Sequence, residues 1–197
     1  MFEAGDRDAT GPSPLPPQAP AGLRLDRAFL SLLEEADLLR QLQALALTEA
    51  RYKGWTARRR VASFGGSYDF ERQRLEPAAP IPEALRPLRD RVASWAGVQP
   101  GRLADALVAE YRPGTPLGWH RDVPDFEDVF GVSLGGDAVL RFRPWPPRAR
   151  DPRGFALPVP ARSVYQLRGT ARWAWQYAVA PVEAPRWSVT FRTRRGR

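Results

Sequence analysis

A single histidine with a nearby aspartate is the clearest candidate for chemistry in this sequence. His120 is the only histidine among 197 residues, and Asp122 follows two positions later. If the segment is extended, the alternation of side chains puts the imidazole and the carboxylate on one face. Such a pair can occupy two corners of an octahedral ferrous site that a third protein ligand completes. On this spacing alone, a hydrogen-bonded pair at the surface is the commoner arrangement.

The charge of the chain points to an anionic partner or to a biased composition. Lysine and arginine total 30 against 22 acidic residues, which gives a formal net charge of +8, and most of the basic residues are arginine. The guanidinium fork suits phosphate and carboxylate groups, so a polyanion such as nucleic acid is one interpretation. An arginine-rich proteome is the other, and the 21 prolines agree with it. Charge alone leaves both open.

The absence of cysteine excludes several classes of site. Disulfides, thiolate metal ligands and cysteine nucleophiles are impossible in this chain. The N-terminal stretch has no basic start and no apolar segment of the kind that marks a secretory signal. No apolar run approaches the length of a membrane span. These features predict a cytoplasmic protein without a membrane partner, and we expect a monomer.

Helices are predicted in the first half of the chain. Residues 1–22 are rich in Pro, Gly and Ala and predict a disordered tail, which leaves a single domain over residues 23–197. A capping box at Ser31 and leucines at helical spacing predict a helix over residues 31–47. A second helix is predicted over residues 82–96, ending at Gly97. Pro87 fits that helix only within its first turn.

Short apolar runs replace the helical pattern from about residue 104. They alternate with Gly and Pro and are rich in β-branched and aromatic residues, which is typical of strands. The clearest runs are Phe130–Leu134, Ala138–Phe142, Ser163–Leu167 and Trp187–Phe191. Helices followed by many short strands predict an α+β fold with a sandwich or barrel-like core.

The order of several short motifs resembles the AlkB-like family of iron(II)/2-oxoglutarate-dependent dioxygenases. The resemblance covers about residues 22–195, and the conjunction is more specific than any one motif. The motifs are Thr56–Arg60, Phe64–Tyr68, Tyr111–Gly114, His120–Asp122, Val132–Gly135, Arg141–Arg143 and Arg186–Arg192.

The resemblance implies a fold, a chemistry and a set of site residues. It implies a double-stranded β-helix, a jelly-roll-like barrel with N-terminal helices packed on it. His120 and Asp122 match two Fe(II) ligands. Tyr111 and Arg186 match residues that bind 2-oxoglutarate, and Arg192 matches a second arginine near its iron-chelating end. The even separation of the two arginines places them on one face of a strand.

The third iron ligand departs from the family's pattern. Trp175–Val179 matches the segment that carries the second histidine, and Tyr177 falls on the ligand position. Because a phenol has a reference pKa of about 10, it must lose a proton to bind metal strongly. Gln176 would point to the opposite face of the strand, so it is a poor substitute. A slow enzyme with an unusual site, a metal-free binding protein and an engineered or drifted variant are all open.

Nucleic acid is the partner that family and charge together indicate. Arg58, Arg59 and Arg60 are candidate phosphate contacts, and Trp55 or Tyr68 is a candidate for stacking on a base. Ordinary core packing is an equally good interpretation of the two aromatics.

Two functions follow from these expectations. The first is oxidative demethylation of alkylated nucleic acid bases, as in DNA repair, with the target base taken out of the stack. The second is a non-catalytic barrel that binds modified nucleic acid, its metal site impaired by Tyr177.

Overall fold

Two facing sheets form a barrel, as the sequence predicts. The computed structural model describes residues 13–52, 55–149 and 151–196, without the side chains of residues 50–52 and 55–57. One sheet has the order β1 (Leu23–Asp26), β11 (Val164–Leu167), β8 (Phe126–Gly135), β13 (Arg186–Arg194), β6 (Leu103–Tyr111), β3 (Trp55–Phe64) and β2 (Thr48–Tyr52). The facing sheet has the order β10 (Phe155–Val159), β9 (Ala138–Pro144), β12 (Trp175–Val179) and β7 (Leu117–His120). The predicted double-stranded β-helix is confirmed.

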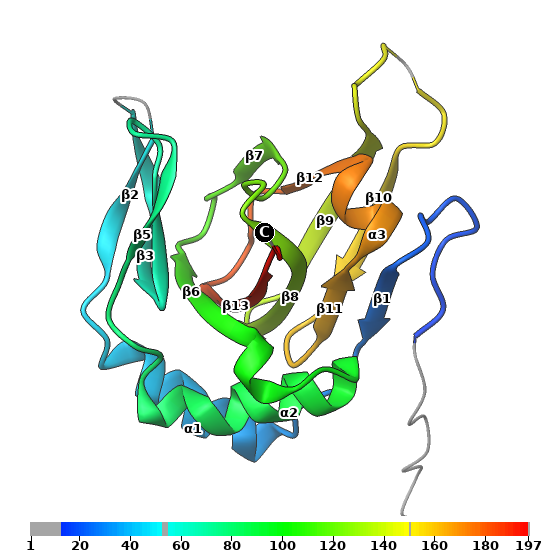
Figure 1. The fold of residues 1–197 in the computed structure, drawn as a ribbon. Helices are drawn as coiled ribbons and strands as arrows, with labels where there is room; N and C mark the ends of the chain where they lie inside the picture. Colours follow the sequence, from blue (N-terminus) through cyan, green and yellow to red (C-terminus); the bar gives the residue numbers. More distant parts are fainter. Residues whose placement is uncertain (1–12, 53–54, 150, 197) are drawn as a thin grey trace, which may run out of the picture.

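A separate two-stranded hairpin lies beside β2 and β3, at one end of the larger sheet. It consists of β4 (Gly66–Asp69) and β5 (Arg74–Pro77), which pair with each other. Together with β2 and β3 it forms the upright lobe at the left of Figure 1. The candidate nucleic acid residues 55–60 and Tyr68 therefore belong to one lobe of the fold.

The first helix begins where its capping box predicts. Helix α1 covers Leu32–Gln43, and Ser31 caps it through the Glu34 amide while the Glu34 carboxylate accepts from the Ser31 amide. The helix ends earlier than the predicted residue 47. Apolar spacing continues past the end, but β2 begins at Thr48, so the chain needs the intervening residues to turn into the sheet.

The second helix is preceded by a short 3-10 turn, η1 (Glu83–Leu85). Helix α2 then covers Arg86–Ala96, with Pro87 in its first turn, where a missing backbone N–H costs no helical hydrogen bond. Gly97 ends it with a φ of 67°, a conformation that suits glycine. A second 3-10 turn, η2 (Pro100–Arg102), leads into β6, and a short helix α3 (Gly169–Trp173) precedes β12.

Two hydrophobic cores lie on opposite faces of the larger sheet. Helices α1 and α2 cover its outer face at the foot of the molecule in Figure 1. The second core fills the barrel between the sheets. Strand β13 lies between the two cores. Its residues Trp187, Val189 and Phe191 belong to the outer core. The alternate residues of β13, from Arg186 to Arg192, therefore face the barrel interior.

The segment before β1 packs on the barrel. The Ser13 amide donates to the Leu25 carbonyl at 2.8 Å, and Leu15 and Ala19 pack against the barrel core. Residues 13–22 lie within the segment predicted to be disordered, whereas residues 1–12 lie outside the described residues. Within the described part of the chain, no helix has the length and apolar character needed to cross a membrane.

Candidate functional site

Strands β7 and β12 bring His120 and Tyr177 together inside the barrel. The two residues are direct partners in the antiparallel register, and their ring centroids lie 4.2 Å apart. The His120 Nδ1 atom lies 2.9 Å from the Gly118 carbonyl oxygen. A proton on Nδ1 would satisfy that oxygen and leave the lone pair of Nε2 free. Burial lowers the pKa of His120, so the imidazole is neutral near pH 7.

Asp122 lies just past the end of β7, beside these two rings. Its side chain is 4% exposed and accepts two short hydrogen bonds, from the Tyr177 hydroxyl at 2.5 Å and from Arg192 Nε at 2.6 Å. Burial alone would raise the pKa of Asp122, but Arg192, His120 and the Tyr177 hydroxyl outweigh it and hold the pKa below its ordinary value. The carboxylate is therefore ionised and already shared by a phenol and a guanidinium.

The Tyr177 phenol keeps its proton in this arrangement. Burial raises its pKa well above the ordinary value, and the charge of Asp122 and the hydrogen bond to it act in the same direction. A phenol that donates to a neighbouring carboxylate is not a phenolate ligand. The predicted position of Tyr177, facing the interior beside His120 and Asp122, is confirmed.

Arg172 fixes the loop that carries Asp122. Its side chain is 3% exposed, and Nη2 donates to the carbonyl oxygens of Asp122, Val123 and Phe126 at 3.0, 2.8 and 2.9 Å. These bonds fold the chain after β7 back against α3. Sequence analysis missed this role because three backbone acceptors leave no motif.

We expect Arg172→Met to destabilise the protein by about 1–3 kcal/mol, because buried carbonyls lose their donor. Urea unfolding measures the change in free energy. Arg40→Met is the matched control, since the Arg40 side chain is 76% exposed on helix α1. Equal stability of the two variants would contradict the role assigned to Arg172.

Arg186 has a buried guanidinium that does not use all of its hydrogen-bond donors. It is 1% exposed, Nε donates to the Ser133 hydroxyl at 2.9 Å, and Cζ lies 4.9 Å from the centroid of the Tyr111 ring. Nη1 is buried and has no partner among the described residues. An unpaired buried donor of this kind suits an anionic ligand.

Ser133 and Tyr165 complete the wall around Arg186 and were not predicted as site residues. Tyr165 crosses the backbone of Gly131, where an added Cβ would lie 2.4 Å from the tyrosine hydroxyl. Burial raises the pKa of Tyr165 to about 12. A glycine and a serine inside the otherwise apolar run of β8 are the signals that could have indicated a close approach and a polar contact.

The predicted nucleic acid residues are only partly brought to the site. Arg59 lies close enough for its charge to contribute to the lowered pKa of His120, after burial and other causes. Arg58 is exposed, whereas Arg60 is paired with Glu110 at 2.5 Å. Tyr68 packs edge-on against Phe70, with ring centroids 5.0 Å apart. The Trp55 side chain lies outside the described residues.

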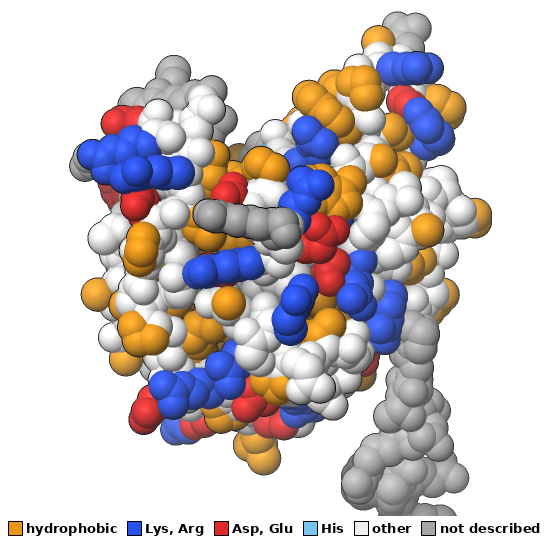
Figure 2. Space-filling view, in the orientation of Figure 1, with side chains coloured by type: hydrophobic (Ala, Val, Ile, Leu, Met, Phe, Trp, Pro, Cys, Tyr) orange, Lys and Arg blue, Asp and Glu red, His pale blue; other side chains and the backbone are white. Residues whose placement is uncertain are grey.

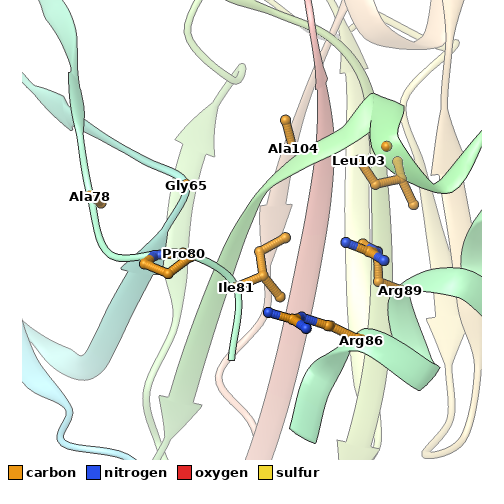
Figure 3. A pocket seen from close by; sticks show the side chains of 9 residues that line it. Gly65, Ala78, Pro80, Ile81, Arg86, Arg89, Leu103 and Ala104 are labelled. Atoms are coloured by element: carbon orange, nitrogen blue, oxygen red, sulfur yellow. The ribbon is translucent and has the colours of Figure 1, made fainter. Parts of the chain in front are cut away.

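A cavity of about 570 Å³ lies elsewhere, between the start of α2, the β5–η1 connection and the start of β6. Figure 3 shows Arg86 and Arg89 beside Ile81 and Leu103 at this cavity. Both arginines are already paired, Arg86 with Glu83 and Arg89 with Asp90. The cavity contains none of the residues around His120 and Arg186, so it is separate from the site.

The sequence profile of the 2OG-Fe(II) oxygenase superfamily matches residues 24–196, and the chain belongs to that superfamily. The solved structure of OsALKBH1 superimposes with a TM-score of 0.67 over 93% of this chain and all of that one. Its identity to this chain is 17%, so it supports the fold alone.

Two curated relatives match over most of the chain. A Macaca fascicularis protein named tRNA (carboxymethyluridine(34)-5-O)-methyltransferase ALKBH8 is 28% identical over 174 residues, 84% of this chain and 25% of its own length. An Arabidopsis thaliana protein named alkylated DNA repair protein ALKBH8 homolog is 28% identical over 180 residues, 80% of this chain and 50% of its own. The chain thus spans a quarter to a half of these relatives and is AlkB-like in family.

The site fits the two cofactors of the superfamily unequally. The unpaired Nη1 of Arg186 suits a carboxylate of 2-oxoglutarate. His120 and Asp122 can supply two ligands to iron. The Tyr177 hydroxyl instead donates a hydrogen bond to Asp122 and does not supply a third ligand. In the part of the chain that the structure describes, no group of three or more His, Cys, Asp or Glu side chains is arranged to hold a metal. The residues fit the dicarboxylate and do not form a complete iron triad.

Proposed function

We propose that this chain is an AlkB-type protein that takes 2-oxoglutarate and alkylated nucleic acid into one barrel, with oxidative demethylation of the base as its reaction. The observation that carries the proposal is the buried Arg186 guanidinium, whose Nη1 has no hydrogen-bond partner among the described residues. Such a cation is costly to keep inside a barrel unless an anion completes it. Membership of the oxygenase superfamily supports 2-oxoglutarate as that anion.

Nucleic acid as the substrate class is supported by the relatives and by the charge. The names of both curated relatives refer to nucleic acid, one to tRNA and one to alkylated DNA. The net charge of +8 favours a polyanion. Figure 2 shows basic side chains in several groups on one face of the molecule, one of them over the lobe of β2 to β5. Arg59 of that lobe lies close enough to His120 for its charge to lower the pKa of the imidazole, after burial as the main cause.

The roles of the site residues follow from their positions. His120 and Asp122 are the proposed metal ligands, and Arg192 holds Asp122 ionised and oriented. Arg186, Ser133 and Tyr111 are the proposed cradle for the distal carboxylate of 2-oxoglutarate. Iron held by His120 and Asp122, without Tyr177 as a third ligand, would supply the activation of O2. The net reaction would convert an N-methyl base, O2 and 2-oxoglutarate to the free base, formaldehyde, succinate and CO2.

Product analysis tests the proposal directly. Methylated and unmethylated oligonucleotides are incubated with the chain, ferrous ion, ascorbate and 2-oxoglutarate, and bases and succinate are measured by mass spectrometry. We expect demethylation and succinate in equal amounts with the methylated substrate, and none with His120→Ala. Succinate without demethylation would reject alkylated nucleic acid as the substrate.

A second function is favoured by one specific observation, the 2.5 Å hydrogen bond from Tyr177 to Asp122. It occupies a carboxylate that iron would need. A barrel with this bond would bind 2-oxoglutarate and modified nucleic acid without turning them over. Binding of the methylated oligonucleotide, together with no product at saturating iron, would establish this function in place of the first.

The basic run of β3 should contribute to nucleic acid binding through charge. Replacing Arg58, Arg59 and Arg60 by glutamine should weaken binding and lower the slope of log affinity against log salt by up to about 2, the value for three contacts to single-stranded nucleic acid. Arg60 should contribute least because Glu110 neutralises it. Fluorescence anisotropy with a labelled oligonucleotide at several salt concentrations measures the slope. An unchanged slope would remove this strand from the interface.

A further inference from the structure

The outer face of the smaller sheet carries exposed tryptophan and arginine side chains. Strand β9 alternates, with Leu140 and Phe142 buried in the barrel core while Val139 and Arg141 are exposed. On β7 the same alternation turns Trp119 outward next to the inward His120. We call the five side chains involved the Trp119 platform: Trp119, Arg121, Arg141, Arg143 and Trp145.

Cation–π contacts join the members of the platform in two groups, one around Trp119 and one around Trp145. The guanidinium carbon of Arg143 lies 4.3 Å from the centroid of the Trp119 ring, and that of Arg141 lies 5.8 Å away. Arg121 lies 4.6 Å from the ring centroid of Trp145. Trp119 and Trp145 nevertheless remain 36% and 42% exposed. Each indole therefore keeps surface for a further planar group.

The register explains how an edge tryptophan reaches the arginines. Gln176 on β12 pairs with Arg143 on β9, and Ala178 pairs with Arg141. Ala178 occupies an outward position between β7 and β9, yet it is 1% exposed. Its small side chain leaves room for the Trp119 ring to lie towards β9. Gln176 also fixes Arg143, whose Nε donates to the Gln176 Oε1 at 2.9 Å.

In the part of the chain that the structure describes, the three arginines of the platform have no carboxylate partners. Among the described residues, no Asp or Glu oxygen lies within 4.0 Å of the guanidinium nitrogens of Arg121, Arg141 or Arg143, although many other arginines of the chain are paired in this way. Their charges are therefore available to an external anion. An unpaired cation beside an exposed indole combines the two contacts that single-stranded nucleic acid uses, phosphate attraction and base stacking.

We propose that the Trp119 platform binds a segment of single-stranded nucleic acid, with phosphates on the arginines and a base stacked on Trp119. The proposal rests on the proposed function for the class of partner, and it adds a surface outside the site. Strand β7 is an edge of its sheet. Trp119 and His120 are consecutive on this edge strand and point to opposite faces, so nucleic acid bound beside His120 could continue around the edge to Trp119.

Binding of an unmethylated, fluorescein-labelled oligothymidylate to the full chain tests the platform without involving the site's chemistry. We expect Trp119→Ala to weaken binding roughly 5- to 100-fold, as for loss of one stacked base. The triple variant Arg121→Gln, Arg141→Gln, Arg143→Gln should lower the salt slope by about 2. The control triple variant Arg40→Gln, Arg86→Gln, Arg89→Gln removes the same charge from ion-paired positions and should keep the native slope.

The outcomes separate the platform from the proposed function. Loss of affinity in both platform variants, with native thermal unfolding and a native control, supports the platform. If the platform variants bind as the native chain does, while the variant with Arg58, Arg59 and Arg60 replaced by glutamine binds more weakly, the platform is overturned and a nucleic acid function stands. If Trp119→Ala matches the native chain and only the arginines matter, stacking is overturned. If the native chain binds no oligothymidylate at low salt, the platform is overturned whatever the demethylation assay gives.

Discussion

Replacing Tyr177 by histidine should raise the Fe(II) affinity of this protein by about 10- to 100-fold or more. Even partners outside the ligand set change metal affinity by that factor, and here a ligand is added. Tyr177 is the register partner of His120, so the new imidazole would face the same interior space. The exchange also removes the phenol from Asp122, a charge-assisted bond worth about 1.5–3 kcal/mol. Succinate formation should rise with metal content.

Tyr177→Phe separates the two parts of this effect. It removes the hydroxyl from Asp122 but supplies no ligand, so any gain in iron affinity would come from freeing the carboxylate alone. Metal content after anaerobic ferrous loading and succinate should be measured for all three proteins, with thermal unfolding to exclude a folding defect. A native chain that makes succinate, and loses this activity in Tyr177→His, would identify Tyr177 as a working part of an altered site. If no variant binds iron or makes succinate, the non-catalytic function is the better account.

Much of the site was accessible from the sequence because it depends on local order. The period of two in β13 separates Trp187, Val189 and Phe191 from the arginines on either side of them, and these three apolar side chains all belong to the outer core. The position of Tyr177 opposite His120 also followed from motif order. The capping box of α1 and the glycine stop of α2 are local in the same sense.

What the sequence did not reveal depends on contacts between distant segments. Arg172 finds its three carbonyl partners about fifty residues earlier in the chain. The pairing of Trp119 with Arg143 requires the register across β7, β12 and β9. The phenol–carboxylate bond of Tyr177 could be anticipated only as proximity, because the rotamers that align the two oxygens are set by packing. Such contacts follow from topology, which the local pattern does not encode.

Replacing Arg186 by methionine should weaken 2-oxoglutarate binding roughly a hundred- to several-thousand-fold. The estimate corresponds to about 3–5 kcal/mol for a buried charge that loses its partner. Arg186→Lys should recover only part of the affinity, because an ammonium lacks the fork that binds a carboxylate through two parallel hydrogen bonds. Calorimetry of 2-oxoglutarate with the ferrous-loaded chain under nitrogen, repeated with EDTA, measures the loss with and without metal. Arg195→Met is the control, since the Arg195 side chain is 58% exposed and follows directly after β13, the strand that carries Arg186.

The stability of the ligand-free variant decides whether Arg186 serves the ligand or the fold. Its guanidinium is 1% exposed, donates to Ser133 and has no partner for Nη1 among the described residues. Replacement of an incompletely paired buried charge by an apolar side chain of similar length is often neutral or stabilising. We therefore expect Arg186→Met to unfold at or above the native temperature while losing the upward shift that 2-oxoglutarate gives the native chain. A variant that unfolds well below the native protein and still binds 2-oxoglutarate would make Arg186 a structural residue and place the co-substrate elsewhere.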